Sequence, residues 1–357
     1  MPIKGVRFDT AKARETITRG RRANWWHRRG TAARGFSYFD KKGRKVVRRD
    51  DLERIATLAV PPAWKHVRIN PGPGGKIQAV GMDTTGRVQY LYHPKHTARQ
   101  SRRKFEKVER FAKLLPKLQK MTNRDIALEG LPREKVIAVT LRLINCLYFR
   151  VGSEHSAVHY KTFGITTLRK DHLSIGRKGK LSFNFVGKSH VQHRRILVDD
   201  ELSAIMKELD SLGRGRKLFR YLDDCGKPCS ITPADINTYL KDATEPEFSS
   251  KDLRTWGGTL LAAIRLAELG PAEDTAQQKK NVVKAVKYVA EELGNTPAVC
   301  RGSYIHPFVI NAYCNGITIE EYQPRHSRRI RQIQLAAEPE EHALLKLLQA
   351  CRESAGT

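Results

Sequence analysis

The sequence predicts an α+β protein in which a small antiparallel-sheet domain is followed by a mainly α-helical domain with a short β-hairpin sheet. Short alternating apolar runs separated by turns occupy residues 35–92, a pattern typical of antiparallel strands. Beyond residue 99, apolar residues recur mostly at helical spacing. With 357 residues, the chain is longer than one average domain, so two domains are expected.

The N-terminal part is expected to contain a basic arm and then the sheet. Residues 1–34 have almost no apolar periodicity apart from Trp25-Trp26, so we expect an arm there. The strand-rich domain covers residues 35–98, and one helix around Asp50 to Ala59 interrupts its strands. Those strands, separated by Gly, Pro and Asp turns, are Phe36-Ser37-Tyr38-Phe39, Val67-Arg68-Ile69, Ile77-Gln78-Ala79-Val80 and Val88-Gln89-Tyr90-Leu91-Tyr92.

The polar stretch from Pro94 to Ser101 lacks apolar periodicity, so we place the domain boundary there. The mainly helical domain then covers residues 99–322, and residues 323–357 form a tail with a short helix. No internal repeat is visible in the sequence.

Three amphipathic helices are expected in the second domain. The first follows Pro132, the second is capped by Ser250 and closed by Gly270-Pro271, and the third ends at Gly294. Their apolar stripes are Val136, Val139, Leu143, Ile144 and Leu147; Leu253, Trp256, Leu260, Ile264 and Ala267; and Val282, Ala285, Val286, Val289, Ala290 and Leu293.

A β-hairpin interrupts these helices. Leu181, Phe183 and Phe185 alternate along its first strand. The turn is Gly187-Lys188-Ser189, and the second strand runs from Val191 to Val198.

The charge balance indicates a polyanionic partner. Lys and Arg total 66 against 37 Asp and Glu, which gives a formal net charge of +29. Residues 1–50 alone contain 16 Lys and Arg but 4 Asp and Glu, a net charge of +12. Such an excess recruits nucleic acid and makes binding sensitive to salt. A ribosomal or chromatin-like role would explain the charge equally well.

Several classes of protein are excluded by what the sequence lacks. It has no apolar run of membrane-spanning length and no signal peptide, so we expect a soluble cytoplasmic protein without a membrane partner. Its six cysteines do not form a disulfide framework. Cys225 and Cys229 lack a second ligand pair for zinc, and Pro71 to Lys76 is a turn cluster without a phosphate-binding loop. We therefore expect no metal and no cofactor.

The segment from Gly294 to Tyr304 places a tyrosine just beyond a helix end. A tyrosine hydroxyl can attack a phosphodiester only where other groups neutralise the phosphorane charge and protonate the departing oxygen. The alternative is a tyrosine that packs against a helix start.

Three upstream cations are candidates for that support. Arg150 ends a helix, where a cation is favoured by the dipole in any case. Arg254 lies in the first turn of a helix, where cations are disfavoured, so it suits an anion that the helix amides share. Lys188 lies at the hairpin turn, where it is either a solvated loop charge or a proton donor carried into a DNA groove.

With these residues in this order, the chain resembles the poxvirus-like type IB DNA topoisomerases, and their bacterial members in particular. The resemblance extends from about Gly35 to Tyr322. The segments that carry it are Pro61-Pro62-Ala63-Trp64, Gly86-Arg87-Val88-Gln89-Tyr90-Leu91-Tyr92, Tyr148-Phe149-Arg150-Val151-Gly152, Phe185-Val186-Gly187-Lys188, Lys251-Asp252-Leu253-Arg254-Thr255 and Gly294-Asn295-Thr296-Pro297.

The resemblance implies a tyrosine recombinase/topoisomerase IB-like fold and relaxation of supercoiled DNA without ATP or metal. Tyr304 would form a 3′-phosphotyrosyl bond, Arg150 and Arg254 would hold the non-bridging oxygens, and Lys188 would protonate the departing 5′ oxygen. Arg87, Gln89, Tyr90 and Tyr92 match DNA-contacting residues of the smaller domain. The implied partner is duplex DNA in the nucleoid, which a monomer clamps between two lobes.

One position departs from the poxvirus pattern. Those enzymes have histidine where this chain has Asn295, an amide that can donate a hydrogen bond to a phosphate oxygen but cannot carry charge. We therefore expect Asn295 to stabilise the transition state without a histidine's pH dependence.

Two other functions remain open at this point. A tyrosine recombinase shares the Arg-Lys-Arg-Tyr set, but it usually has histidine three residues before the second arginine, where this chain has Lys251. A non-catalytic basic DNA-binding protein would explain the charge and leave Tyr304 structural.

Overall fold

The computed structural model describes residues 10–319 and 339–356. The chain divides into two compact units, with the division between Arg103 and Lys104. We describe each unit by itself.

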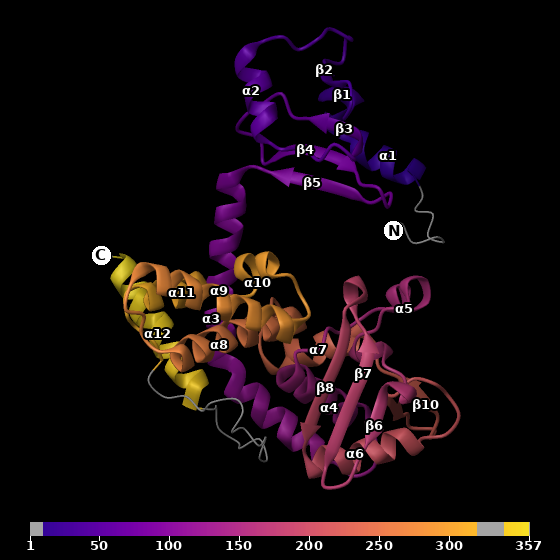
Figure 1. Ribbon diagram of the computed structural model, residues 1–357. Coiled ribbons are helices and arrows are strands. Elements are labelled where there is room, and N and C mark those ends of the chain that lie inside the picture. The colour runs from indigo at the N-terminus through magenta and orange to yellow at the C-terminus, as the bar shows by residue number, and fades with distance from the viewer. Residues whose placement is uncertain (1–9, 320–338, 357) are drawn as a thin grey trace. The chain divides into compact units, whose positions relative to one another are not determined.

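The first unit is built on one five-stranded antiparallel sheet with strand order β2-β1-β3-β4-β5 (Figure 1). Its strands are β1 (Trp26–Thr31), β2 (Gly35–Phe39), β3 (Lys65–Ile69), β4 (Ile77–Met82) and β5 (Val88–Tyr92). Its helical elements are α1 (Thr10–Thr18), the 3-10 turn η1 (Gly20–Asn24) and α2 (Arg49–Thr57).

The two faces of this sheet have separate apolar clusters. Ala13 and Ile17 of α1 pack with Val80 and Met82 of β4. On the other face, Ile55 of α2 joins the second cluster, whose buried strand residues are Val67, Ile69 and Ala79. Because successive strand residues point to opposite faces, this alternation fixes which side chains lie beside α1 and which lie beside α2.

The expected arm over residues 1–34 differs from what the structure contains. Residues 10–24 are mostly helical, and β1 lies inside the sheet, paired with both β2 and β3. The reason is that Ile17 and Trp25 bury apolar surface against the sheet, while the charged sequence of β1 hides the period-2 pattern. Residues 1–9 lie outside the described residues.

The expected boundary stretch also differs from the structure. Residues 94–101 form the start of a 33-residue helix, α3 (Pro94–Ile126), and the division between the units falls within this helix. The first buried side chain of α3 is Phe105. The turns before it bury no side chain, so they need no apolar residues and show no apolar periodicity.

The second unit is mainly helical, as expected. Besides α3, its helices are α4 (Arg133–Leu147), α5 (Glu154–Tyr160), α6 (Asp200–Ser211), α7 (Pro233–Ala243), α8 (Ser250–Leu269), α9 (Thr275–Leu293), α10 (Pro297–Ser303), α11 (Pro307–Cys314) and α12 (Pro339–Gly356). Short 3-10 turns are η2 (Ile165–Thr167), η3 (Lys170–His172) and η4 (Lys188–His190).

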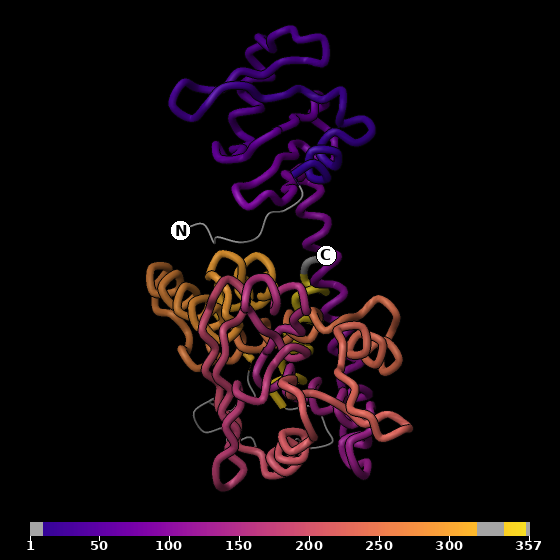
Figure 2. The backbone as a smooth tube through the Cα atoms, turned by 90° about the vertical axis from the view of Figure 1, so that its right-hand side faces the viewer, coloured from indigo at the N-terminus to yellow at the C-terminus, as the bar shows by residue number. Residues whose placement is uncertain are grey.

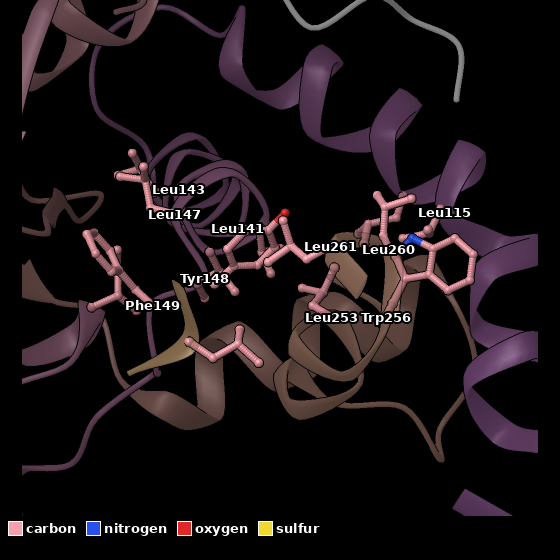
Figure 3. Packing of buried hydrophobic residues seen from close by; sticks show 14 of the residues in the cluster. Leu115, Leu141, Leu143, Leu147, Tyr148, Phe149, Leu253, Trp256, Leu260 and Leu261 are labelled. Carbon is pink, nitrogen blue, oxygen red and sulfur yellow. The ribbon is translucent and has the colours of Figure 1, made fainter. Parts of the chain in front are cut away.

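Helix α8 lies in the middle of the core of this unit. Leu253, Trp256 and Leu260 of α8 pack within one continuous cluster with residues of α4, and the close view in Figure 3 shows these side chains together. Sixteen of the twenty residues of α8 are buried, which explains why the stretch from Trp256 to Ala267 is mostly apolar. The helix begins at Ser250, so the capping residue is Ser249 and not Ser250 as expected. The expected glycine stops at Gly270 and Gly294 are confirmed.

Two small antiparallel sheets complete the second unit. The expected hairpin is β7 (Lys180–Val186) with β8 (Gln192–Val198), and a third strand that the pattern did not indicate, β6 (Leu173–Ile175), pairs with β7. The other sheet is β9 (Arg220–Leu222) with β10 (Pro228–Ser230). Figure 1 shows β7 and β8 as two long neighbouring arrows beside the helices, and Figure 2 shows the backbone of the same unit turned by 90°. The predicted fold class is confirmed.

Candidate active site

Arg150 follows the end of α4. The helix ends because Tyr148 adopts a left-handed conformation with φ of 55°, so Arg150 lies three residues beyond Leu147, the last residue of the helix, and not in its last turn. Its Nη2 donates to the carbonyl oxygen of Gly294 at 3.1 Å and to Oδ1 of Asn295. Two predicted site residues that are 145 positions apart are therefore in direct contact.

Arg254 lies in the second turn of α8, just beyond the first turn in which we expected it, and 4% of its surface is exposed. Its Nη2 donates to the carbonyl oxygen of Leu293 at 2.9 Å, which satisfies one end of the fork. Its Nε and Nη1, together with Nδ2 of Asn295, are buried and have no hydrogen-bond partner within the described part of the chain. Buried donors normally have a partner, so this cluster is suited to an anion.

Tyr304 ends α10 and is half buried. The centre of its ring lies 5.7 Å from Cζ of Arg254. Its backbone is held against α8, because Thr259 Oγ1 donates to the Tyr304 carbonyl oxygen at 3.2 Å. A Cβ atom added to Gly258 would lie 2.8 Å from the same oxygen, so the missing side chain at that position allows the close approach.

The positive charges at this site are poorly solvated. Burial, and then the nearby charge of Arg150, lower the pKa of Arg254 to about 10, while Tyr304 acts in the opposite direction. Burial also lowers the pKa of Arg150. Both guanidinium groups stay charged near neutral pH, and an anion between them would relieve their mutual repulsion.

Lys188 lies at the end of the β7–β8 hairpin, in η4, with an exposed side chain. The turn is tight, because Ser189 and His190 both adopt positive φ angles, of 62° and 57°. Among the described residues, no hydrogen bond or ion pair joins the side chain of Lys188 to the other four predicted site residues. The structure thus gathers Arg150, Arg254, Asn295 and Tyr304, whereas Lys188 lies at a hairpin tip without a direct hydrogen bond to them in the described residues.

The expected DNA-contacting residues of the first unit fall into two groups. The rings of Tyr90 and Tyr92 stack with their centres 6.1 Å apart. Gln89 instead donates from Nε2 to Asp83 at 2.8 Å, and the backbone N–H of Arg87 donates to the same carboxylate. Tyr90 packs with the α1 cluster and neighbouring Leu91 packs with the α2 cluster, as strand alternation requires.

A basic groove that the sequence pattern did not indicate lies on the same unit. It has a volume of about 560 Å³ and no acidic side chain in its lining. We call it the α1 groove; its charged and histidine lining residues are Arg14, Arg28, Arg29, Lys41, Arg68, His27 and His66. These residues come from α1, β1, the turn after β2, and β3, so only the folded sheet brings them together.

Within the described residues, no group of three His, Cys, Asp or Glu side chains is arranged to hold a metal ion. In the same residues, no helix is both long and apolar enough to cross a bilayer.

Comparison with known proteins defines the class. Residues 93–329 match the family model described as eukaryotic DNA topoisomerase I, catalytic core, so the class of protein is a DNA topoisomerase. Residues 35–83 match the model described as bacterial DNA topoisomerase IB, N-terminal domain. The chain belongs to the type IB DNA topoisomerases.

Relatives support the same family. The chain is 33% identical over 287 residues to the DNA topoisomerase 1B of Acanthamoeba polyphaga mimivirus, a match that covers 78% of this chain and 84% of the relative. It is 22% identical over 229 residues to the DNA topoisomerase 1B of Vaccinia virus (strain Copenhagen), covering 63% and 69%. As a member of this family, the protein is an isomerase that relaxes supercoiled DNA, and the recombinase and non-catalytic alternatives are not favoured.

Proposed function

We propose that Tyr304 is the nucleophile that forms a 3′-phosphotyrosyl bond, while Arg150, Arg254 and Asn295 hold the scissile phosphate. The observation that carries this proposal is the set of three buried donors without a hydrogen-bond partner in the described residues, Nε and Nη1 of Arg254 and Nδ2 of Asn295. The Arg254 guanidinium among them lies 5.7 Å from the centre of the Tyr304 ring. Donors already fixed in place stabilise a developing charge without having to reorganise during the reaction.

The chemical step transfers a phosphoryl bond without any change of oxidation state. The phenolic oxygen of Tyr304 bonds to phosphorus as its proton passes to water, and the bond from phosphorus to the 5′ oxygen breaks. Charge builds up on the non-bridging oxygens, where two guanidinium groups and an amide serve in place of a metal ion. The tyrosyl ester conserves the bond energy, so religation needs no nucleotide.

Lys188 is proposed as the group that protonates the departing 5′ oxygen. Support comes from its exposed position at the tip of a hairpin, because a lysine on a flexible stem can reach a bound strand. An ammonium group can give up a proton, whereas a guanidinium holds its protons too tightly for this task.

The first unit is proposed to bind the same duplex. The Tyr90–Tyr92 stack and the α1 groove offer aromatic faces and cations without a competing carboxylate in the groove lining. Phosphate contacts of this kind position a protein on DNA without reading its sequence. We propose that a monomer closes its two units around supercoiled duplex DNA, and that the cut strand swivels while Tyr304 holds its 3′ end.

Relaxation of a supercoiled plasmid in EDTA without ATP tests this proposal. The wild-type protein should relax the plasmid, and denaturant should trap a covalent adduct whose nucleotide maps to the peptide containing Ser303-Tyr304. Tyr304→Phe should bind DNA with unchanged affinity and leave the plasmid supercoiled. Relaxation by Tyr304→Phe, or a nucleotide on another peptide, would remove Tyr304 from this role.

A further inference from the structure

His193 of β8 is a buried residue that neither the sequence pattern nor the proposed chemistry uses. Only 6% of its surface is exposed. Its ring stacks on Phe185 of β7, with ring centres 5.0 Å apart and planes inclined by 14°. Phe185 in turn meets the edge of Phe149 at 5.1 Å, and Phe149 immediately precedes Arg150. A column of three rings therefore joins both strands of the hairpin to the segment that carries Arg150.

The edge of the imidazole is wedged between two glycines. A Cβ atom added to Gly187 would lie 2.5 Å from Cδ2 of His193, and one added to Gly294 would lie 2.5 Å from Cε1. At Gly187 the φ angle is −95°, which any residue can adopt, so the backbone conformation does not require glycine. Glycine is required because a side chain would collide with the His193 ring. Gly187 directly precedes Lys188, and Gly294 directly precedes Asn295.

The same strand also holds the end of α9. Arg195, which points to the same face of β8 as His193, donates from Nη2 to the carbonyl oxygens of Glu291 and Glu292 at 2.9 and 2.8 Å. These are among the last carbonyls of α9, which lack partners inside the helix. Arg195 thus links the β7–β8 hairpin to the end of α9 by hydrogen bonds. The His193 ring, two residues earlier on β8, separates the backbone at Gly187 from the backbone at Gly294.

The imidazole occupies the space between the two glycines as an uncharged ring. Its Nε2 lies 2.6 Å and 2.8 Å from the Cβ positions that side chains at Gly187 and Gly294 would take. Burial, followed by the charges of Arg195, Arg150 and Arg254, lowers the pKa of His193 to about 4. The ring is neutral near neutral pH and does not add a third cation beside the two arginines.

We propose that His193 is a positioning residue that fixes the distance between the hairpin carrying Lys188 and the phosphate site formed by Arg150 and Asn295. This inference depends on the proposed function, because it assumes that Lys188 protonates the 5′ oxygen. With the spacer in place, the lysine tip reaches the leaving oxygen. Without the imidazole ring, the backbones at Gly187 and Gly294 can move closer together. Lys188 is then displaced from the leaving oxygen.

The test uses two duplexes with one mapped cleavage site. One has the natural 5′ oxygen at the scissile bond, and the other has sulfur in that position, because a thiolate leaves without needing a proton. Single-turnover cleavage is measured for wild type, Lys188→Ala, His193→Ala, Asn295→Ala and the control Ile196→Ala, whose exposed side chain lies on the same strand.

On the oxygen substrate, His193→Ala and Lys188→Ala should both slow cleavage, by on the order of 10²-fold for loss of proton donation. On the sulfur substrate both defects should shrink to less than about tenfold, while the Asn295→Ala defect persists, because its charge stabilisation is still needed. Ile196→Ala should match wild type on both.

The outcomes separate the two proposals. If sulfur fails to relieve Lys188→Ala, the proposed role of Lys188 is wrong. If sulfur relieves Lys188→Ala but leaves His193→Ala equally slow, or if His193→Ala cleaves at the wild-type rate, the positioning role is overturned.

If His193→Ala does not fold, Gly187→Ala tests the positioning role of His193 instead. Alanine is compatible with the backbone there, and its methyl group pushes the imidazole away from its present position. A defect that sulfur relieves supports the inference, and a defect of the same size on both substrates contradicts it.

Discussion

In the proposed phosphate site, each end of the Asn295 amide would have its own task. Its Oδ1 accepts a hydrogen bond from Arg150, which holds that guanidinium in place, while its Nδ2 is buried without a partner in the described residues. The histidine that poxvirus enzymes carry at this position could also donate, but it could carry charge as well. An amide keeps the donor and gives up the pH dependence.

Asn295→Asp separates these two tasks. The carboxylate keeps the acceptor for Arg150 but removes the donor and adds a negative charge where the phosphate would lie. Single-turnover cleavage should fall on the order of 10²–10³-fold, the typical cost of losing one positioned donor. An unchanged rate would show that Nδ2 does not contact the transition state.

His193 should also affect stability as a function of pH. Its pKa of about 4 in the folded protein lies below the ordinary value of 6.5, so between these values the unfolded chain binds a proton that the folded chain does not. The contribution of His193 to the free energy of unfolding is therefore fully present above pH 6.5 and is lost as the pH falls toward 4. The slope approaches about 1.4 kcal/mol per pH unit.

His193→Gln provides the comparison, because glutamine does not titrate. The difference in melting temperature between wild type and His193→Gln should change steadily between pH 6.5 and about 4 and stay constant above about pH 7. A difference that is the same at every pH would mean that folding does not lower the pKa of His193.

At the scale of elements, α8 is the scaffold of the site. It carries Arg254, and its Gly258 and Thr259 fix the backbone of Tyr304. Glycine inside a helix costs about 1 kcal/mol relative to alanine, so Gly258 is unfavourable for the helix alone. The close approach of Tyr304 gives a physical reason for its presence.

Gly258→Ala should therefore improve the helix and harm the reaction. Its Cβ would lie 2.8 Å from the Tyr304 carbonyl oxygen and 3.1 Å from Tyr304 Cβ, so Tyr304, the proposed nucleophile, must shift. A displacement of this kind should slow single-turnover cleavage at least tenfold, with DNA affinity unchanged. The matched control is Gly302→Ala, also near Tyr304, where an added Cβ meets nothing within 4 Å. Equal rates for the two variants would contradict the argument.

The elements that could be predicted from sequence have strong local signals. Helices α8 and α9 have long apolar stripes closed by Gly270 and Gly294, and β7 alternates cleanly. Strand β1 is not predicted because its sequence, WHRRGT, is mostly polar, and the strand forms through pairing with β2 and β3. Tertiary pairing overrides local pattern in such a strand.

The residues of the candidate site also fall into those that the sequence indicates and those that only the fold reveals. Motif order pointed to Arg150, Arg254, Asn295 and Tyr304, which the fold brings together. His193 could not be singled out, because a histidine in a strand has no local signature and its importance comes from two glycines about 100 residues apart. The α1 groove was missed for the same reason, since its lining residues are dispersed from α1 to β3.

At the scale of the whole molecule, the positions of the charged side chains matter as well as the net charge of +29. The α1 groove is lined by five Lys and Arg side chains, none of which forms an ion pair with a carboxylate among the described residues, whereas Arg48 and Arg49 at the start of α2 each pair with a carboxylate. Unpaired cations in a concave surface focus the field more than neutralised ones do. DNA affinity should therefore depend on which charges are removed, at equal net charge.

Two double variants test this dependence, each of which removes two positive charges. Arg29→Ala with Lys41→Ala empties part of the α1 groove, and Arg48→Ala with Arg49→Ala removes charges that are already paired. In a titration of duplex binding against salt, the slope of log K against log salt should become less negative by roughly 0.9 for each phosphate that the variant no longer neutralises. The groove variant should show this change and the α2 variant should not. Equal slopes for the two variants would mean that the groove does not bind phosphate, because counterion release depends on which phosphates are neutralised and not on total charge.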